Sequence, residues 1–166
     1  MAFYKQFYKA EELVAKYFEG KVDKGGNDYK YHLYDVANSV EKELSCGTER
    51  EMCMVVGLLH DILEDTDCTV EILWENGFDD EIIDAIVAIT RRKDEHSYFD
   101  FIKRVKSNEI ARVVKIYDLE NNMDIRRLSK LEEKDLKRLK KYWYCWKYLK
   151  DEIDEETCIN SLNNKI

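Results

Sequence analysis

The sequence contains no proline at any of its 166 positions. Because proline interrupts helices, its absence permits long uninterrupted helices and removes a common stop signal. No apolar run approaches the roughly 20 residues that a membrane span requires. The first residues, Met1 to Lys5, also lack the pattern of a signal peptide. These absences predict a cytoplasmic protein without a membrane partner.

Cysteine pairs of the C-x-x-C type are absent as well, and the number of cysteines, five, is odd. In a cytoplasmic chain this favours free thiols, several of them buried as small apolar residues, over disulfides or a zinc–thiolate site. The cysteines are Cys46, Cys53, Cys68, Cys145 and Cys158.

Positive charge is in deficit, because the formal net charge is −8 while 37% of the residues are charged. Nucleic acids and anionic membranes reward a basic face, so this balance argues against both as the main partner. It leaves room for an anionic small molecule held in a local basic pocket. With 45% hydrophobic residues, the chain suits one domain, residues 1–166, with a single sizeable core.

Helical periodicity and turn residues predict an all-α helical bundle. A central helix opens at Thr48, where Thr48 and Glu51 have the spacing of a capping box, and contains the apolar run of residues 52–59. Ser129 and Glu132 predict a second capping box, before a long charged helix. The other expected helices cover residues 3–19, 29–44, 70–74, 79–89, 98–105, 109–122 and 130–152, with a short helix at the end.

The central stretch from Gly57 to Thr66 is the most informative one, because a buried apolar helix runs directly into four polar side chains. These side chains are His60, Asp61, Glu64 and Asp65. Buried carboxylates are costly unless they are paired, hydrogen-bonded or bound to a cation. The stretch therefore predicts a metal site.

Two further positions supply candidate ligands, His32 near the start of its helix and Asp118 after an apolar helical run. Lys115, Asp118 and Asn122 are spaced at i, i+3 and i+7, so they share one helix face. A lone buried histidine is usually a satisfied core residue. Here two histidines and two aspartates from three helices predict an open site with nitrogen and oxygen ligands, suited to Mn, Fe or Zn.

The order of these groups resembles the HD-domain metal-dependent phosphohydrolases, and the flanking residues resemble one branch, the RelA/SpoT-type (p)ppGpp hydrolases. The branch pattern Leu-Leu-His-Asp-x-x-Glu-Asp-Thr-x-x-Thr occurs without a gap from Leu58 to Thr69. A basic residue and glycine before Tyr-x-x-His match Lys24–Gly25 and Tyr29–His32. The pattern Lys-x-x-Asp-x-x-x-Asn matches Lys115 to Asn122.

The resemblance implies a divalent ion, Mn²⁺ in the family, held by His32, His60, Asp61 and Asp118. It implies that Glu64 and Asp65 orient and deprotonate the attacking water, and that Lys24, Asn122 and Tyr142 bind the nucleotide substrate. The implied reaction is removal of the 3′-pyrophosphate of (p)ppGpp by a small stand-alone hydrolase. A bound cation lowers the pKa of water, and a neighbouring carboxylate can accept its proton.

Departures from the family pattern lie at the positions that contact substrate. The family commonly has Arg-Lys before the glycine, where this chain has Asp23–Lys24, and its Arg-Leu-His-Asn after the aspartate is Leu119 to Asn122 here. One phosphate contact is therefore missing or replaced. The candidates for replacing it are Arg91, Arg92, Arg104, Arg126 and Arg127.

Two alternatives remain open at the level of the sequence. An HD-type phosphohydrolase of other nucleotides or deoxynucleotides could use the same helices, and a binding module could hold a nucleotide or metal without turnover. The second acidic pair, Glu64 and Asp65, argues against the binding module, since a structural metal site has no need of it. The aromatic cluster of residues 142–148 favours core packing, with a homo-oligomer contact as a second use.

Overall fold

The computed structural model describes residues 2–23 and 25–163, and the regular elements among them are helices. One isolated antiparallel bridge joins Val22 to Asp28. The all-α prediction is confirmed, and no helix in the described part of the chain could cross a membrane. The helices are α1 (Ala2–Tyr17), α2 (Lys30–Glu43), α3 (Thr48–Leu59), α4 (Ile62–Asp65), α5 (Val70–Glu75), α6 (Asp80–Ile89), α7 (Tyr98–Lys106), α8 (Glu109–Met123), the 3-10 turn η1 (Ile125–Arg127), α9 (Glu133–Leu149) and α10 (Glu155–Asn163).

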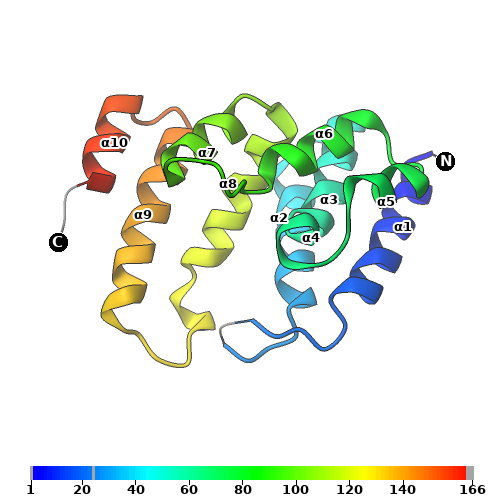
Figure 1. Ribbon diagram of the computed structural model, residues 1–166, viewed down its shortest axis with the longest axis horizontal. Coiled ribbons are helices and arrows are strands. Elements are labelled where there is room, and N and C mark those ends of the chain that lie inside the picture. The colour runs from blue at the N-terminus through cyan, green and yellow to red at the C-terminus, as the bar shows by residue number, and fades with distance from the viewer. Residues whose placement is uncertain (1, 24, 164–166) are drawn as a thin grey trace.

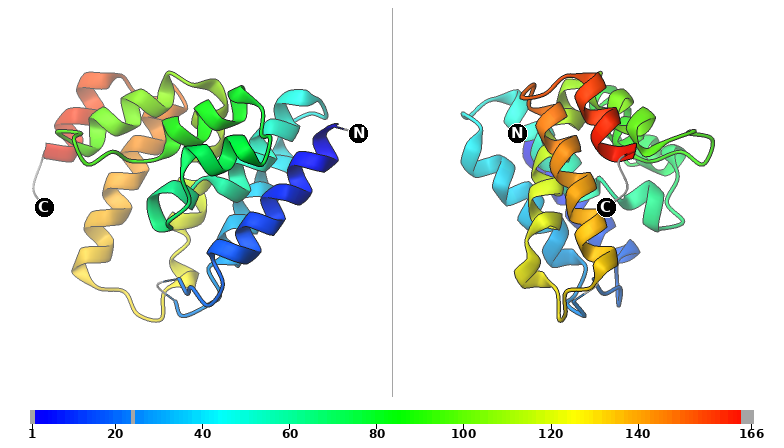
Figure 2. Two further views of the ribbon diagram at one scale, coloured as in Figure 1. Left: turned by 45° about the vertical axis from the view of Figure 1, so that its right-hand side comes forward. Right: turned by 90° about the vertical axis from the view of Figure 1, so that its left-hand side faces the viewer.

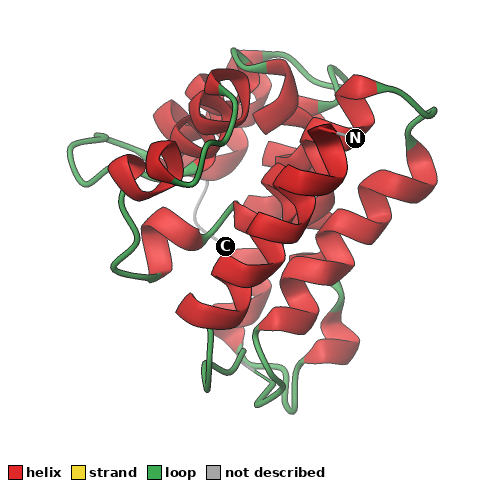
Figure 3. Ribbon diagram, turned by 90° about the vertical axis from the view of Figure 1, so that its right-hand side faces the viewer, coloured by secondary structure: helices red, strands yellow, loops and turns green. Residues whose placement is uncertain are grey.

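Helices α3 and α8 form the centre of the bundle. Helix α3 packs against α1, α2, α6 and α8, while α8 also packs against α7 and α9. Helix α1 lies at one end and the pair α9 and α10 at the other, so α8 joins the two halves (Figures 1 and 2). Figure 3, coloured by secondary structure, shows these helices linked only by loops and turns.

Helix α3 is buried along its second half, as the apolar run predicts. Every residue from Cys53 to Leu59 is buried, because α3 has helices packed around it on several sides. Gly57 allows α2 to approach closely, since a Cβ atom there would lie 3.0 Å from the Cα of Ala37 on α2. All five cysteines are free thiols, and four of them are buried, as expected.

The central helix does not continue through the polar residues. Helix α3 ends at Leu59, and Asp61 adopts φ −101° and ψ 0°, in the sparsely populated bridge region where active-site residues often lie. The single turn α4 then starts at Ile62, and its Asp65 N–H donates to the Asp61 carbonyl over 2.9 Å. The break lets His60 and Asp61 leave the end of a buried helix together.

Neither predicted capping box forms. The N-cap of α3 is Gly47, so Thr48 is already helical, and the long helix α9 begins three residues later than predicted. Glu132 is the N-cap of α9, and its side chain and that of Asp135 bond reciprocally to each other's backbone N–H groups. This pair has the same spacing as Ser129 and Glu132 but lies one turn further on, which explains the shifted start.

Substituting Gly57 by alanine tests the close approach of α2 and α3. The added Cβ would meet the Ala37 backbone, which cannot move aside as a flexible side chain can, so we expect a loss of about 1–3 kcal/mol in the free energy of unfolding. Urea unfolding followed by circular dichroism measures it. The control is Asn38→Ala on the exposed side of α2, expected to change stability by less than about 0.5 kcal/mol. Equal midpoints for Gly57→Ala and the wild type would contradict the packing described.

Candidate metal and active site

The four predicted metal ligands converge where α3 ends. His32 comes from α2, His60 and Asp61 from the α3–α4 junction, and Asp118 from α8. The Nε2 atom of His32 lies 3.2 Å from Asp118 Oδ1 and 3.7 Å from Asp61 Oδ2. The Nε2 atom of His60 lies 3.1 Å from Asp61 Oδ2 and 3.5 Å from Asp118 Oδ1. Residues 86 positions apart thus face one small volume, with each imidazole between two carboxylates.

The Nδ1 atom of each histidine, on the side of the ring away from the shared volume, lies within hydrogen-bond distance of an oxygen. His60 Nδ1 lies 2.8 Å from the carbonyl oxygen of Gly57, and His32 Nδ1 lies 2.7 Å from the amide oxygen of Asn121. The carbonyl oxygen of Gly57 can only accept, so His60 Nδ1 carries a proton, while His32 Nδ1 also lies 3.3 Å from Arg127 Nη1, which can only donate. The Nε2 atom of each ring faces the shared volume, which is the side that metal-binding histidines present to an ion.

The electrostatics of this volume favour a positive charge at its centre. His60 is 1% exposed, and its Nε2 makes no hydrogen bond to a described residue. Burial lowers the pKa of His60, but Asp61 and Asp118 outweigh it and raise the pKa to about 10. Burial raises the pKa of Asp61, while His60 brings it down to about 2. His32, His60 and Asp61 could accordingly hold a metal ion, with Asp118 beside them.

A second layer of side chains orients the carboxylates. Lys115 Nζ donates to Asp118 Oδ2 over 2.7 Å and Asn122 Nδ2 donates to Asp118 Oδ1, so the predicted shared face of α8 is present. Against the effect of burial, Lys115 and the two histidines hold the pKa of Asp118 well below its usual value. The hydroxyl of Tyr29 donates to Asp61 Oδ2 over 2.6 Å.

Tyr29 and Asn121 are residues to which the sequence assigned no role. Tyr29 is the tyrosine of the Tyr-x-x-His pattern, and its hydroxyl also lies 3.1 Å from Asp65 Oδ2. The pattern itself was the signal available for it. Asn121 is adjacent to Asn122, and nothing in the sequence distinguishes which of the two amides contacts His32.

The acidic pair Glu64 and Asp65 lies on α4, directly after His60 and Asp61, and both residues are exposed. Glu64 Oε2 accepts the backbone N–H of Arg91 over 3.1 Å. Partial burial raises the pKa of the Glu64 carboxyl, and burial together with the charge of Asp61 raises that of Asp65. A raised pKa makes a carboxylate a better proton acceptor at neutral pH.

The three residues predicted to bind substrate differ in what the structure shows of them. Lys24 lies outside the described residues. Asn122 is engaged through its Nδ2 with Asp118. Tyr142 is partly buried, and its ring centroid lies 6.3 Å from that of Tyr98, with the planes tilted by 39°.

Asp23, which stands where the family commonly has arginine, forms an ion pair with Arg127. Arg127 Nη2 lies 3.0 Å from Asp23 Oδ2, and Nη1 donates to the amide oxygen of Asn121. Burial raises the pKa of Asp23, but its hydrogen bonds to Asn27 and Arg127 give a net lowering. Arg127 thus links Asp23, in the loop between α1 and α2, to Asn121, the residue that contacts His32. It also lines a small cavity of about 80 Å³ beside His32.

Comparison with known proteins gives a match in structure only. No protein-family model matches the chain, and no curated protein matches it. A solved structure of a metazoan ortholog of SpoT, which hydrolyzes ppGpp and plays a role in starvation responses, superposes with a TM-score of 0.67 at 18% identity. The match covers 96% of this chain and 86% of that one. The chain therefore has the all-α HD-domain fold, with a His/Asp group that could bind a metal at the position just described.

The contact between Asn121 and His32 predicts a measurable change in metal affinity. Asn121→Ala leaves His32 Nδ1 without its acceptor, so we expect Mn²⁺ to bind about 10–100-fold more weakly. Isothermal titration calorimetry measures the dissociation constant. Asn160→Ala, on the exposed side of α10, serves as the control and should bind as the wild type does. An unaltered affinity in Asn121→Ala would show that this amide does not orient the ligand.

Metal binding should also stabilise the fold, because the donors come together only in the folded chain. At a Mn²⁺ concentration of about 100 times the dissociation constant, we expect roughly 2.7 kcal/mol of stabilisation. The measurement is the unfolding temperature with Mn²⁺ and again after EDTA. Asp61→Ala should lose this shift and Asp67→Ala, an exposed acid in the next loop, should keep it. A shift of equal size in both variants would place the ion elsewhere.

Proposed function

We propose that this protein is a metal-dependent phosphohydrolase that removes the 3′-pyrophosphate of (p)ppGpp, with Mn²⁺ as its metal. The observation that carries the proposal is the convergence of two histidines and two aspartates from three helices beside an exposed acidic pair. The shared fold with a ppGpp-hydrolysing SpoT ortholog supports the substrate class. Residues 1–166 would act as a single catalytic domain.

In this proposal His32, His60, Asp61 and Asp118 hold the ion. A bound divalent cation lowers the pKa of water and polarises the phosphoryl group. Lys115 offsets the buried negative charge of Asp118, so that Asp118 stays ionised beside Asp61. Tyr29 fixes the direction of the Asp61 carboxylate through its hydroxyl.

Glu64 and Asp65 orient the attacking water and accept its proton. The water oxygen forms a bond to the phosphorus attached to the 3′ oxygen, the bond between that phosphorus and the 3′ oxygen breaks, and the 3′ oxygen takes up the proton that the water gave to the carboxylate. The products are GDP or GTP with a free 3′-hydroxyl, together with pyrophosphate. The backbone N–H of Arg91 holds one oxygen of Glu64, which leaves its other oxygen for the water.

Lys24, Asn122 and Tyr142 bind the nucleotide in this proposal. Because Asn122 gives its Nδ2 to Asp118, its contact with the nucleotide falls to the amide oxygen. Tyr142 packs against the ribose or base, and Lys24 neutralises phosphate.

A pair of substitutions separates metal binding from proton transfer. Asp61→Ala should lose bound Mn²⁺ and activity together, because a ligand is removed. Glu64→Gln should keep the metal and lose about 10²–10⁴-fold in kcat, because an amide cannot accept the proton. Pyrophosphate release from ppGpp in the presence of Mn²⁺ gives the rates, and metal analysis of the purified protein gives the occupancy.

The matched control for this test is Glu75→Gln, an exposed glutamate on α5, which should turn over as the wild type does. Normal turnover by Glu64→Gln would remove Glu64 from the role of base. Release of monophosphate from other nucleotides, with ppGpp left intact, would replace the proposed substrate.

A further inference from the structure

Electric charge is divided unequally between the two halves of the chain. Residues 1–90 contain eight basic and 20 acidic side chains, whereas residues 91–166 contain 19 basic and 15 acidic ones. The folded helices keep this division in space, because α1 to α6 lie towards one end of the bundle and α7, α9 and α10 towards the other (Figure 1). The protein therefore has an acidic end and a basic end, although its net charge is −8.

The acidic end carries an exposed tryptophan. Trp74, on α5, is 55% exposed, although tryptophan is on average a highly buried residue. Helix α5 lies beside α1 at this end, where Lys9 donates to the carbonyl of Asn76 (Figure 1). Residues 67–84 include no basic side chain and seven exposed acids, which are Asp67, Glu71, Glu75, Asp79, Asp80, Glu81 and Asp84. None of these seven forms an ion pair with a residue that the structure describes. Trp74 is thus an apolar projection on an acidic surface.

The basic end has an open apolar groove where the end of α8 and η1 meet α9. The groove has a volume of about 610 Å³ and is lined by Met123, Ile125, Leu139, Lys140, Trp143 and Tyr144. Ile125 and Trp143 are exposed, so a partner surface can reach the groove. The ring of Trp143 stacks on that of Trp146, with centroids 5.3 Å apart and planes 16° apart, which supports one wall of the groove.

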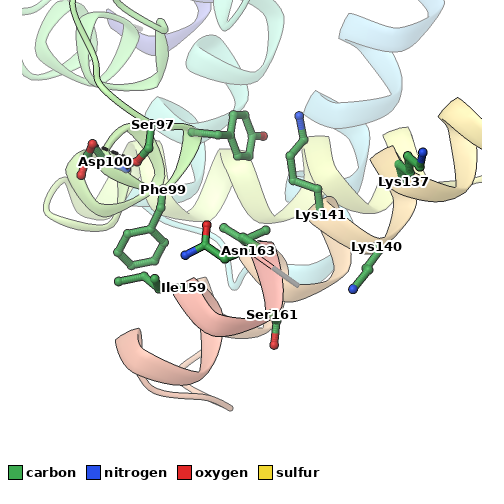
Figure 4. Close-up of a pocket in the computed structure, with 11 residues that line it drawn as sticks. Ser97, Phe99, Asp100, Lys137, Lys140, Lys141, Ile159, Ser161 and Asn163 are labelled. Atoms are coloured by element: carbon green, nitrogen blue, oxygen red, sulfur yellow. Dashed lines mark hydrogen bonds between the residues drawn. The ribbon is translucent and has the colours of Figure 1, made fainter. Parts of the chain in front are cut away.

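Helix α9 has a second hollow on a neighbouring side, and its chemistry is different. A cavity of about 660 Å³ lies between α7, α9 and α10, and its α9 side consists of Lys137, Lys140 and Lys141 (Figure 4). The groove shares Lys140 with this cavity, but the other side chains that α9 gives to the groove are aliphatic or aromatic. The groove is therefore the side of α9 that suits an apolar side chain of a partner.

Basic side chains border the groove. Lys147 Nζ lies 5.3 Å from the centroid of the Trp143 ring. Arg126 follows Ile125 in η1, and its side chain is largely exposed. Both cations have an acidic neighbour within the chain. The attraction for an acidic surface therefore comes from the excess of basic residues at this end of the molecule and not from a single unpaired cation.

A second copy of this chain matches the groove through its acidic end. Two grooves facing each other would bring two basic ends together, and like charges across an interface oppose association. The acidic end has the opposite charge and also presents Trp74, a large apolar side chain that the groove can receive. Tryptophan is enriched among the residues that contribute most to the affinity of protein interfaces.

We propose that copies of this chain associate head to tail, with Trp74 of one copy seated in the groove of the next. Because the tryptophan and the groove are different surfaces at opposite ends of the molecule, the contact is heterologous and can continue from copy to copy. This inference goes beyond the proposed function and does not depend on it.

Sedimentation velocity over a range of protein concentrations measures the association, in EDTA so that no metal ion bridges acidic surfaces. The average mass should rise above the 19.9 kDa of one chain, and salt should lower it again, because ions screen exposed charges. Trp74→Ala should weaken association at least about 30-fold, and so should Ile125→Glu, which places an acid in the groove. The control is Tyr31→Ala, which removes an exposed aromatic side chain on α2 and should associate as the wild type does.

Mixing the two variants distinguishes a head-to-tail contact from a symmetric one. Each variant alone should remain a single chain, but Trp74→Ala retains an intact groove and Ile125→Glu retains the tryptophan. Their mixture should form complexes of two chains and none larger, because each variant has only one working surface.

A wild type that stays a single chain at every concentration overturns the proposal. Association that salt does not lower, or that either substitution leaves unchanged, overturns it as well, and so does a mixture of the two variants that forms no complex. Circular dichroism of each variant checks that the comparison is between folded proteins.

Discussion

The arrangement depends on two carboxylates brought together with two imidazoles at the end of a buried helix. Asp118 is 3% exposed, and both it and Asp61 lie within 3.7 Å of the Nε2 atoms of the two histidines. Such burial of charge is unfavourable unless it is compensated. Lys115 compensates part of it, and the raised pKa of His60 shows that the remaining field favours a further positive charge. A bound cation meets this requirement, so the same electrostatics explain why the ligands converge and why a metal fits.

Much of this could be predicted from the chain, because the decisive signals were local. The apolar run of residues 52–59 indicated a buried helix, and the spacing of Lys115, Asp118 and Asn122 placed all three on one face. The start of α9 was predicted wrongly for an equally local reason. Two pairs of residues with capping-box spacing follow each other there, and the sequence does not say which of them the helix will use.

The residues that contact the predicted ligands could not be predicted from the sequence, because these contacts depend on how the helices are rotated and packed. Successive residues on a helix point about 100° apart, so Asn121 reaches His32 on α2 while Asn122 reaches back to Asp118. The arginines illustrate the same limit. Five were candidates for a missing phosphate contact, and only the folded contacts distinguish Arg104, which holds the end of α6, from Arg91, which lies over Tyr98.

The break after Leu59 has a consequence for how this fold can change. His60 and Asp61 follow the last residue of α3 directly, with no intervening loop. The rotation of that helix about its own axis therefore sets the direction in which both side chains point. Inserting or deleting one residue between Cys53 and Leu59 would swing both headings by about 100°, away from α2 and α8. Surface loops of such a bundle can lengthen or shorten freely. The second half of α3 is fixed in length, because its number of residues sets the direction of the His60 and Asp61 side chains.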